Sequence, residues 1–339
     1  MKIFDSIQLS LIFRWTWSML LATSIVPAVA RAQSWQLAVG AQSNDKGRQA
    51  LAFLPNEIWI HAGDSVTWAI ATDENHTVTF LKPGQVRPSL TAGCPGTTLD
   101  GSSFDGSTCV NGGRMANGQT YTVIFPTAGN FRLVCLIHAN MTAVVHVLDP
   151  SEELPHDQAF YDGQAADERR DLLLDRDHAG DQDRGDLGSS RAHSHGNEVA
   201  TGTGEIVSTA GGIQSVSLVR FMRPTIVIHV GETVEWTSSD VTGHTITFGT
   251  EPPNVTATTP PSANVTMDAD GARHATISSP GDNVHSGLIA PAPQERVGLA
   301  QSPPGVTRFR VTFTNAGVFP YICAFHDDLG MKGEVLVLP

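Results

Sequence analysis

The chain contains 339 residues, which is long enough for two domains of ordinary size. Its formal net charge of −13 argues against nucleic acid as a partner, because binding to phosphates requires a basic surface. The 32 Gly and 20 Pro residues, with few long helical patterns, favour an all-β chain rich in turns.

The N-terminal segment has the pattern of a secretion signal. Lys2 and Arg14 precede an apolar stretch that ends near Val29, and Ala30-Arg31-Ala32 offers a cleavage site. The stretch is short for a membrane span, so an uncleaved anchor is the alternative. We expect residues 1–32 to be a signal peptide, the mature chain to have no membrane span, and the protein to be periplasmic or secreted.

Residues 33–149 have the pattern of a first β domain. Apolar and polar residues alternate along short segments that are separated by turn sequences such as His61-Ala-Gly-Asp64 and Pro126-Thr-Ala-Gly129. Regularly spaced short strands of this kind indicate a sandwich or a barrel. The expected strands cover residues 57–61, 65–68, 76–80, 121–125, 130–135 and 143–148.

Two of the four cysteines bracket a loop rich in Gly, Ser and Thr. They are Cys94 and Cys109, and neither has a counterpart in the second half of the chain. In an oxidising compartment a disulfide is the default interpretation. The alternative is a pair of additional metal ligands.

Residues 150–200 form a linker that carries most of the acidic excess. The residues after Pro155 predict one helix that breaks near Gly180, and the segment beyond it has the composition of a disordered chain. Asp175, Asp177, Asp183 and Asp186 have the spacing of a calcium loop, but other positions of that loop do not match and no second helix follows. A solvated acidic linker is the preferred interpretation.

Residues 201–339 repeat the first domain. Around Val66, Trp68 and His76 the two copies match at an offset of 168, and around Cys135 they match at an offset of 188. A repeat of this length indicates duplicated whole domains. The second copy is longer by an insert, residues 251–304, which we expect to form surface loops.

The repeat carries the same set of metal-binding residue types twice, in the same order. The first set is His76, Cys135, His138 and Met141, and the second set is His244, Cys323, His326 and Met331. Two imidazoles, a thiolate and a thioether are the ligands of a type 1, or blue, copper site, in which the Met is a weak axial ligand. The sequence therefore predicts two type 1 copper sites; the alternative is that only one copy binds the metal.

Both halves resemble the cupredoxins, the family of small blue copper electron carriers. The second half resembles plastocyanin and pseudoazurin, whose loop Cys-x2-His-x4-Met matches Cys323, His326 and Met331. The first half has the shorter Cys-x2-His-x2-Met loop of amicyanin in Cys135, His138 and Met141. The resemblance implies two Greek-key β-sandwiches in tandem, with His138 and His326 as solvent-edge ligands through which electrons pass.

The expected function is electron transfer by an exported protein whose coppers cycle between Cu(II) and Cu(I), with redox proteins such as a cytochrome, oxidase or reductase as partners. The alternatives are a two-domain multicopper oxidase or nitrite-reductase-like enzyme, and a copper storage or delivery protein. Enzymes of the first kind carry a His beside the ligand Cys, because adjacent strand residues point to opposite faces. Here the neighbours are Val134, Leu136, Ile322 and Ala324, which argues against catalysis.

Overall fold

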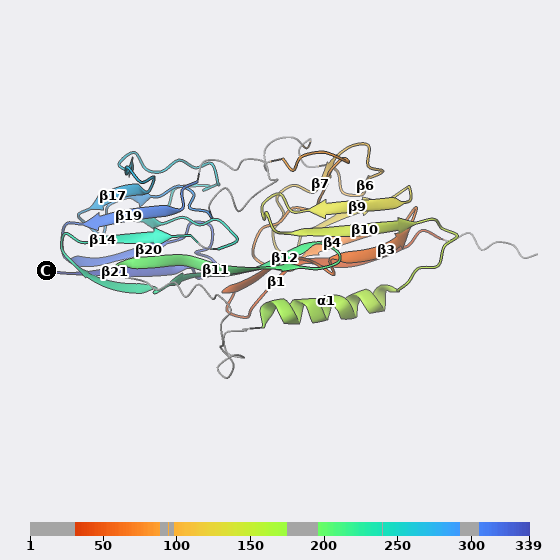
Figure 1. The fold of residues 1–339 in the computed structure, drawn as a ribbon, viewed down its shortest axis with the longest axis horizontal. Helices are drawn as coiled ribbons and strands as arrows, with labels where there is room; N and C mark the ends of the chain where they lie inside the picture. Colours follow the sequence, from red (N-terminus) through yellow and green to blue (C-terminus); the bar gives the residue numbers. More distant parts are fainter. Residues whose placement is uncertain (1–30, 89–93, 95–97, 175–195, 239, 292–304) are drawn as a thin grey trace, which may run out of the picture. The chain divides into compact units, whose positions relative to one another are not determined.

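The computed structural model describes residues 31–88, 94, 98–174, 196–238, 240–291 and 305–339. The expected signal peptide, apart from its last two residues, and the calcium-like spacing from Asp175 to Asp186 lie outside the described residues. Residues Ala32–Pro339 form one compact unit. Apart from one helix, the regular secondary structure of its described part consists of strands, which confirms the all-β expectation (Figure 1).

The first sandwich consists of two sheets. One contains β1 (Ser34–Gln42), β2 (Arg48–Leu54), β4 (Ser65–Ile70), β6 (Ser102–Ser103) and β8 (Thr120–Ile124), in the order β2-β1-β4-β8-β6. The other contains β3 (Glu57–His61), β5 (Thr79–Phe80), β7 (Val110–Asn111), β9 (Gly129–Val134) and β10 (Thr142–Leu148), in the order β3-β10-β9-β5-β7. Strands β1 and β4 pair in parallel, as do β3 and β10, and the remaining pairs are antiparallel except β6 with β8.

The second sandwich repeats this plan. One of its sheets contains β11 (Glu198–Ser208), β12 (Ile213–Met222), β14 (Thr233–Thr237), β16 (Thr266–Met267), β17 (Arg273–Ile277) and β19 (Arg308–Phe313). The other contains β13 (Thr225–His229), β15 (Thr247–Phe248), β18 (Val284–His285), β20 (Gly317–Ile322) and β21 (Lys332–Leu338). The pairings of β11 with β14 and of β13 with β21 are parallel, like their counterparts in the first sandwich.

Period-two alternation builds both cores. In β4, Val66, Trp68 and Ile70 are buried while the residues between them are half-buried, because successive strand side chains point to opposite faces. Trp68 and its counterpart Trp236 are both fully buried near the centre of their sandwiches. Each core is a separate cluster of apolar side chains, and each cluster includes one ligand Cys and one ligand Met.

The insert of the second domain is not only surface loop, so that expectation was wrong for part of it. Residues Arg273–Ile277 form β17, which pairs in parallel with β19 and widens the sheet, and β16 pairs with β17. Ala275 and Ile277 point into the core and are buried. The segment has the alternation of a half-buried strand, which its Pro-, Ser- and Thr-rich surroundings obscured.

The linker forms helix α1 (Gln158–Leu173), which packs on the first sandwich rather than standing free (Figure 1). The Asp157 side chain caps the helix by accepting a hydrogen bond from the backbone N–H of Phe160. Tyr161 is fully buried against Trp35, and its hydroxyl oxygen accepts a hydrogen bond from the backbone N–H of Trp59 at 3.0 Å. The expected break near Gly180 lies outside the described residues.

One hairpin joins the two sandwiches. Strand β12 pairs antiparallel with β2 of the first sandwich, with Ser215 opposite Leu51 and Leu218 opposite Arg48, so that a single eleven-stranded sheet runs through both domains among the described residues. A third apolar cluster covers this joint. Its members are Ala41, Ala50, Ala52, Leu54, Leu172 and Val216.

Candidate metal centres

The first centre lies at one end of the first sandwich. His76 follows a bend and bridges to Met115 just before β5, while Cys135 directly follows β9. His138 and Met141 come from the loop that connects β9 to β10. All four side chains are buried, with at most 2% of any of them exposed.

The ligand atoms of the first centre converge on one point. The Nδ1 atoms of His76 and His138 lie 3.1 Å apart, and they lie 3.9 Å and 3.7 Å from the Sγ of Cys135. Each His turns its Nδ1 toward the thiol, so Nε2 faces the other way. These three atoms would hold one metal ion between them.

The second centre reproduces the first. The Nδ1 atoms of His244 and His326 lie 3.2 Å apart, and they lie 3.8 Å and 3.4 Å from the Sγ of Cys323. Met331 is fully buried in the same core. The two additional residues of this ligand loop form a turn in which the N–H of Leu329 donates to the carbonyl of His326.

Both centres favour a thiolate. The backbone N–H groups of Thr77 and Thr245 each point at a ligand sulfur from 3.4 Å. Burial alone would raise the pKa of each Cys, but the two neighbouring imidazoles hold the pKa values of Cys135 and Cys323 well below normal. The thiolate is the form of cysteine that binds a metal.

An arginine holds each ligand loop through its backbone carbonyls. In the first domain the Arg87 guanidinium donates to the carbonyls of Ala139 and His138, each at 2.8 Å, and to that of Cys135. In the second, Arg220 donates to the Leu329 carbonyl at 2.7 Å and also to the Asp45 carbonyl of the first domain at 2.7 Å. These contacts restrain the loops and so keep the ligands in place.

The upstream histidines, His76 and His244, differ in the hydrogen bonding of their Nε2 atoms. The Nε2–H of His244 donates to the Asp240 carboxylate at 2.8 Å, and both side chains are fully buried. In the first domain Thr72 takes the place of Asp240, and the Nε2 of His76 has no hydrogen-bond partner among the described residues. Burial lowers the pKa of His76, whereas the contacts with Asp240 and Cys323 overcome burial and raise the pKa of His244.

The expectation that His138 and His326 are solvent-edge ligands was wrong for this structure. Each is only 2% exposed, because the two domains meet over them. Glu74 lies between the two rings: its carboxylate is 3.5 Å from the Nε2 of His138 and 3.2 Å from the Nε2 of His326. Burial would raise the pKa of Glu74, but His326 and His138 hold it well below normal.

These residues fit copper. Two neutral imidazole nitrogens, a thiolate and a buried thioether are soft and borderline ligands, which copper accepts and hard cations such as magnesium or calcium do not. Carboxylates lie at the Nε2 atoms of His138, His244 and His326, on the side away from the sulfur, and therefore orient these rings without entering the ligand set.

Comparison with known families agrees with this chemistry. The family model described as copper binding proteins of the plastocyanin/azurin family matches residues 40–148 and again residues 207–338. The chain belongs to the plastocyanin/azurin family of copper-binding proteins. The matches cover both sandwiches, so the chain has two plastocyanin/azurin-type domains in tandem and two copper sites.

Solved structures similar to this plastocyanin/azurin-type chain include variants of amicyanin. A reduced variant is 19% identical and covers 34% of this chain and 82% of its own, with a TM-score of 0.24. A reduced Cu(I) form of another variant at pH 4 is 20% identical and covers 36% and 87%, also with a TM-score of 0.24. No curated protein matches the chain.

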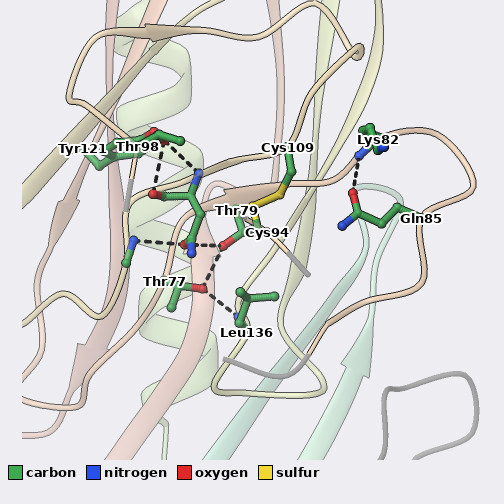
Figure 2. Close-up of a disulfide and its surroundings, with 11 residues drawn as sticks. Thr77, Thr79, Lys82, Gln85, Cys94, Thr98, Cys109, Tyr121 and Leu136 are labelled. Atoms are coloured by element: carbon green, nitrogen blue, oxygen red, sulfur yellow. Dashed lines mark hydrogen bonds between the residues drawn. A yellow bond between two sulfur atoms is a disulfide. The ribbon is translucent and has the colours of Figure 1, made fainter. Parts of the chain in front are cut away.

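The remaining predicted positions lie outside the copper centres. Cys94 and Cys109 form a disulfide, as expected, with Cα atoms 5.7 Å apart (Figure 2). His61 and His229 occupy equivalent positions in the two copies, at an offset of 168. They contact the Glu152 carbonyl and the Glu232 carboxylate, respectively. In the described part of the chain, no helix has the length and apolar character needed to cross a membrane.

Sequence reasoning missed the residues around the ligands. Glu74, Arg87, Asp240 and Arg220 are charged residues in loops or on a strand, without a motif of their own. The one signal available was the aligned but different pair Thr72 and Asp240, where a carboxylate in one copy has no counterpart in the other. The position of Glu74 between the rings depends on how the domains dock.

Proposed function

We propose that the protein is an exported electron carrier with two type 1 copper sites, each cycling between Cu(II) and Cu(I). The supporting observation is that in each sandwich two imidazole Nδ1 atoms and one thiolate converge inside a packed core that also buries a Met. Such a cage cannot rearrange easily, because its ligands are held by strands and by a loop whose carbonyls are bonded to an arginine.

The chain's own residues perform three tasks at each centre. His76, Cys135, His138 and Met141 would hold the metal in the first, and His244, Cys323, His326 and Met331 in the second. The amides of Thr77 and Thr245 stabilise the thiolates, and the surrounding core excludes water. When bound, copper supplies a one-electron couple, and a rigid, dry cage minimises the reorganisation that accompanies it.

Catalysis has less support than electron transfer. The residues beside the ligand cysteines, Val134, Leu136, Ile322 and Ala324, are apolar and cannot ligate a second type of copper. Copper storage or delivery would favour accessible ligands that exchange the metal quickly. The ligands here are buried, which favours retention.

We also propose that the protein is exported and that it exchanges electrons with other redox proteins. Residues 1–32 contain basic residues, then an apolar stretch, then small residues at the expected cleavage site. This order supports cleavage after Ala32 and a periplasmic or secreted location. The disulfide supports an oxidising compartment. The partners we propose are other redox proteins.

The deciding experiment is the copper content and visible spectrum of the exported protein beside Cys135→Ser and Cys323→Ser variants. We expect two coppers per chain and an intense thiolate-to-copper band, with each variant losing one copper and part of the band. A protein that binds no copper, or binds it without this band, would refute the proposal. N-terminal sequencing of the same sample tests cleavage after Ala32.

A further inference from the structure

Glu74 occupies a position that neither the ligand set nor the fold of one domain requires. It belongs to the first domain, two residues before His76, yet one of its carboxylate oxygens lies 3.2 Å from His326 of the second domain. The other oxygen lies 3.5 Å from His138. Only 11% of the Glu74 side chain is exposed, so the contact is nearly sealed from solvent.

The contact of Glu74 with His138 and His326 joins the two ligand sets. In His138 and His326, Nδ1 faces the ligand sulfur and Nε2 faces Glu74. A path from Cys135 to Cys323 thus passes through one imidazole, one carboxylate and a second imidazole. The two centres are separated by little more than these three planar groups.

The surrounding structure holds this arrangement in place. Beside Glu74, Asp73 forms an ion pair with Lys46 at 2.7 Å, in the turn between β1 and β2. Arg220 spans from the carbonyl of Asp45 in that turn to the carbonyl of Leu329 in the second ligand loop. The loop that carries Glu74 and the loop that carries His326 are therefore tied to the same turn.

We propose that Glu74 bridges the two edge histidines and that electrons cross between the two centres along His138, Glu74 and His326. The inference rests on the proposed electron-carrier function. One electron leaves the reduced centre, which is oxidised by one, and arrives at the oxidised centre, which is reduced by one. No bond to Glu74 forms or breaks, and no proton leaves the Nε2 atoms. The two domains thus act as a relay within one chain.

The bridge itself is tested without electron transfer. Protein labelled with 15N at histidine and loaded with Cu(I), which is diamagnetic, is compared with Glu74→Gln and with Glu153→Gln, the same exchange at an exposed carboxylate outside both centres. We expect the Nε2 resonances of both His138 and His326 to shift in Glu74→Gln and to stay unchanged in Glu153→Gln. A shift of only one histidine, or of neither, would overturn the bridge.

The path is tested by pulse radiolysis in a Met331→Gln background, because a changed axial ligand separates the potentials of the two centres. Reduction of one centre should be followed by a first-order exchange whose rate does not depend on protein concentration. We expect Glu74→Gln and Glu74→Ala to slow this exchange several-fold and Glu153→Gln, at an exposed position, to leave it unchanged.

An exchange that depends on concentration, or that is equally fast in all variants, would overturn the path. Failure of the electron-carrier function is recognised separately, because it would show as a missing thiolate-to-copper band before any Glu74 variant is made. Glu74→Gln keeps the size of the side chain. If Glu74→Ala alone fails to fold, the Glu74→Gln variant still provides the test.

Discussion

Asp240 is the clearest difference between the two copper centres at the scale of single residues. Its carboxylate accepts hydrogen bonds from the Nε2 of His244, from the Ser217 hydroxyl and from the N–H of Val241. Close packing leaves no space for any side chain at Gly202, whose Cβ would lie 2.7 Å from the carboxylate. A buried negative charge behind a ligand stabilises the more positive Cu(II), so the second centre should have the lower potential of the two.

Replacing Asp240 tests this assignment. We expect Asp240→Asn to weaken Cu(II) binding at the second centre by roughly 10-fold to 100-fold, the usual effect of losing a ligand's hydrogen-bonded partner. The reduction potential of that centre should rise, because the charge that favours Cu(II) is gone. Spectroelectrochemical titration measures both centres in one sample, and the first centre is the internal control. A fall in the potential of the second centre would contradict the assignment.

At the scale of elements, the disulfide supports the first copper centre from outside. It anchors Cys109 just before β7, and β7 pairs with β5. The Thr79 hydroxyl contacts the Asn111 side chain of β7 and the Thr77 hydroxyl, which accepts a hydrogen bond from the N–H of Leu136 (Figure 2). A polar chain thus runs from the disulfide-bonded segment to the residue after Cys135.

Removal of the disulfide should lower stability without removing copper. The bond closes a loop of 15 residues, for which the chain-entropy estimate is roughly 3 kcal/mol. We expect a Cys94→Ser, Cys109→Ser double variant to lose about this much free energy of unfolding in denaturant titrations. Its thiolate-to-copper band should remain, since neither cysteine is a ligand. Loss of one copper from the double variant would instead assign these cysteines to a metal site.

Helix α1 depends on one aromatic side chain for its position. The Tyr161 hydroxyl oxygen accepts a hydrogen bond from the backbone N–H of Trp59, and the Tyr161 ring is fully buried. We expect Tyr161→Phe to cost about 1 kcal/mol, the value of one hydrogen bond, and Tyr161→Ala to cost about 3–5 kcal/mol, as for other buried aromatic residues. Phe160 is largely exposed, so Phe160→Ala is the matched control. Hydrogen exchange along α1 would show whether the helix detaches, and equal protection in all three variants would contradict this role.

At the scale of the whole molecule, the shared sheet makes the two domains one folding unit. The hairpin of β11 and β12 is long enough to pair with β2 beyond its own sandwich, and its Val216 side chain enters the apolar cluster that covers the joint. Separation of the two domains would expose this apolar cluster to water and would break the hydrogen bonds between β2 and β12. The wild-type chain should therefore unfold in a single cooperative transition.

A charge in this cluster should separate the domains. Val216 is 4% exposed, and burying a carboxylate there costs several kcal/mol, so we expect Val216→Asp to split calorimetric unfolding into two transitions. Val227 lies on β13 with 52% of its surface exposed, so Val227→Asp adds the same charge without entering a core. One transition in both variants would show that the joint does not couple the domains.

Much of the fold was predictable because its signals are local. Alternation placed five strands of the first domain close to their observed positions, whereas the expected strand 76–80 is a strand only at Thr79–Phe80. Trp68 and Trp236, matched by the repeat, are both fully buried in their cores. The pairs β1 with β2 and β11 with β12 were not predicted, since small and polar residues such as Ala50, Ala52, Ser215 and Ser217 carry little alternation. Strands β2 and β12 pair with each other across the two domains, and a local sequence pattern does not record such a long-range pairing.

The sequence by itself determined the chemistry of this protein, and only the tertiary structure decided how its two halves are connected. Ligand identity follows from residue type and spacing along one loop, and the duplication repeats that spacing, so both copper centres can be read from the chain alone. The burial of His138 and His326 and the place of Glu74 between them arise from contact between the domains, such as that of Glu74 with His326, about 250 positions away. Such contacts depend on the pairing of β2 with β12, and a strand's partner is selected by the whole packed structure rather than by its own residues.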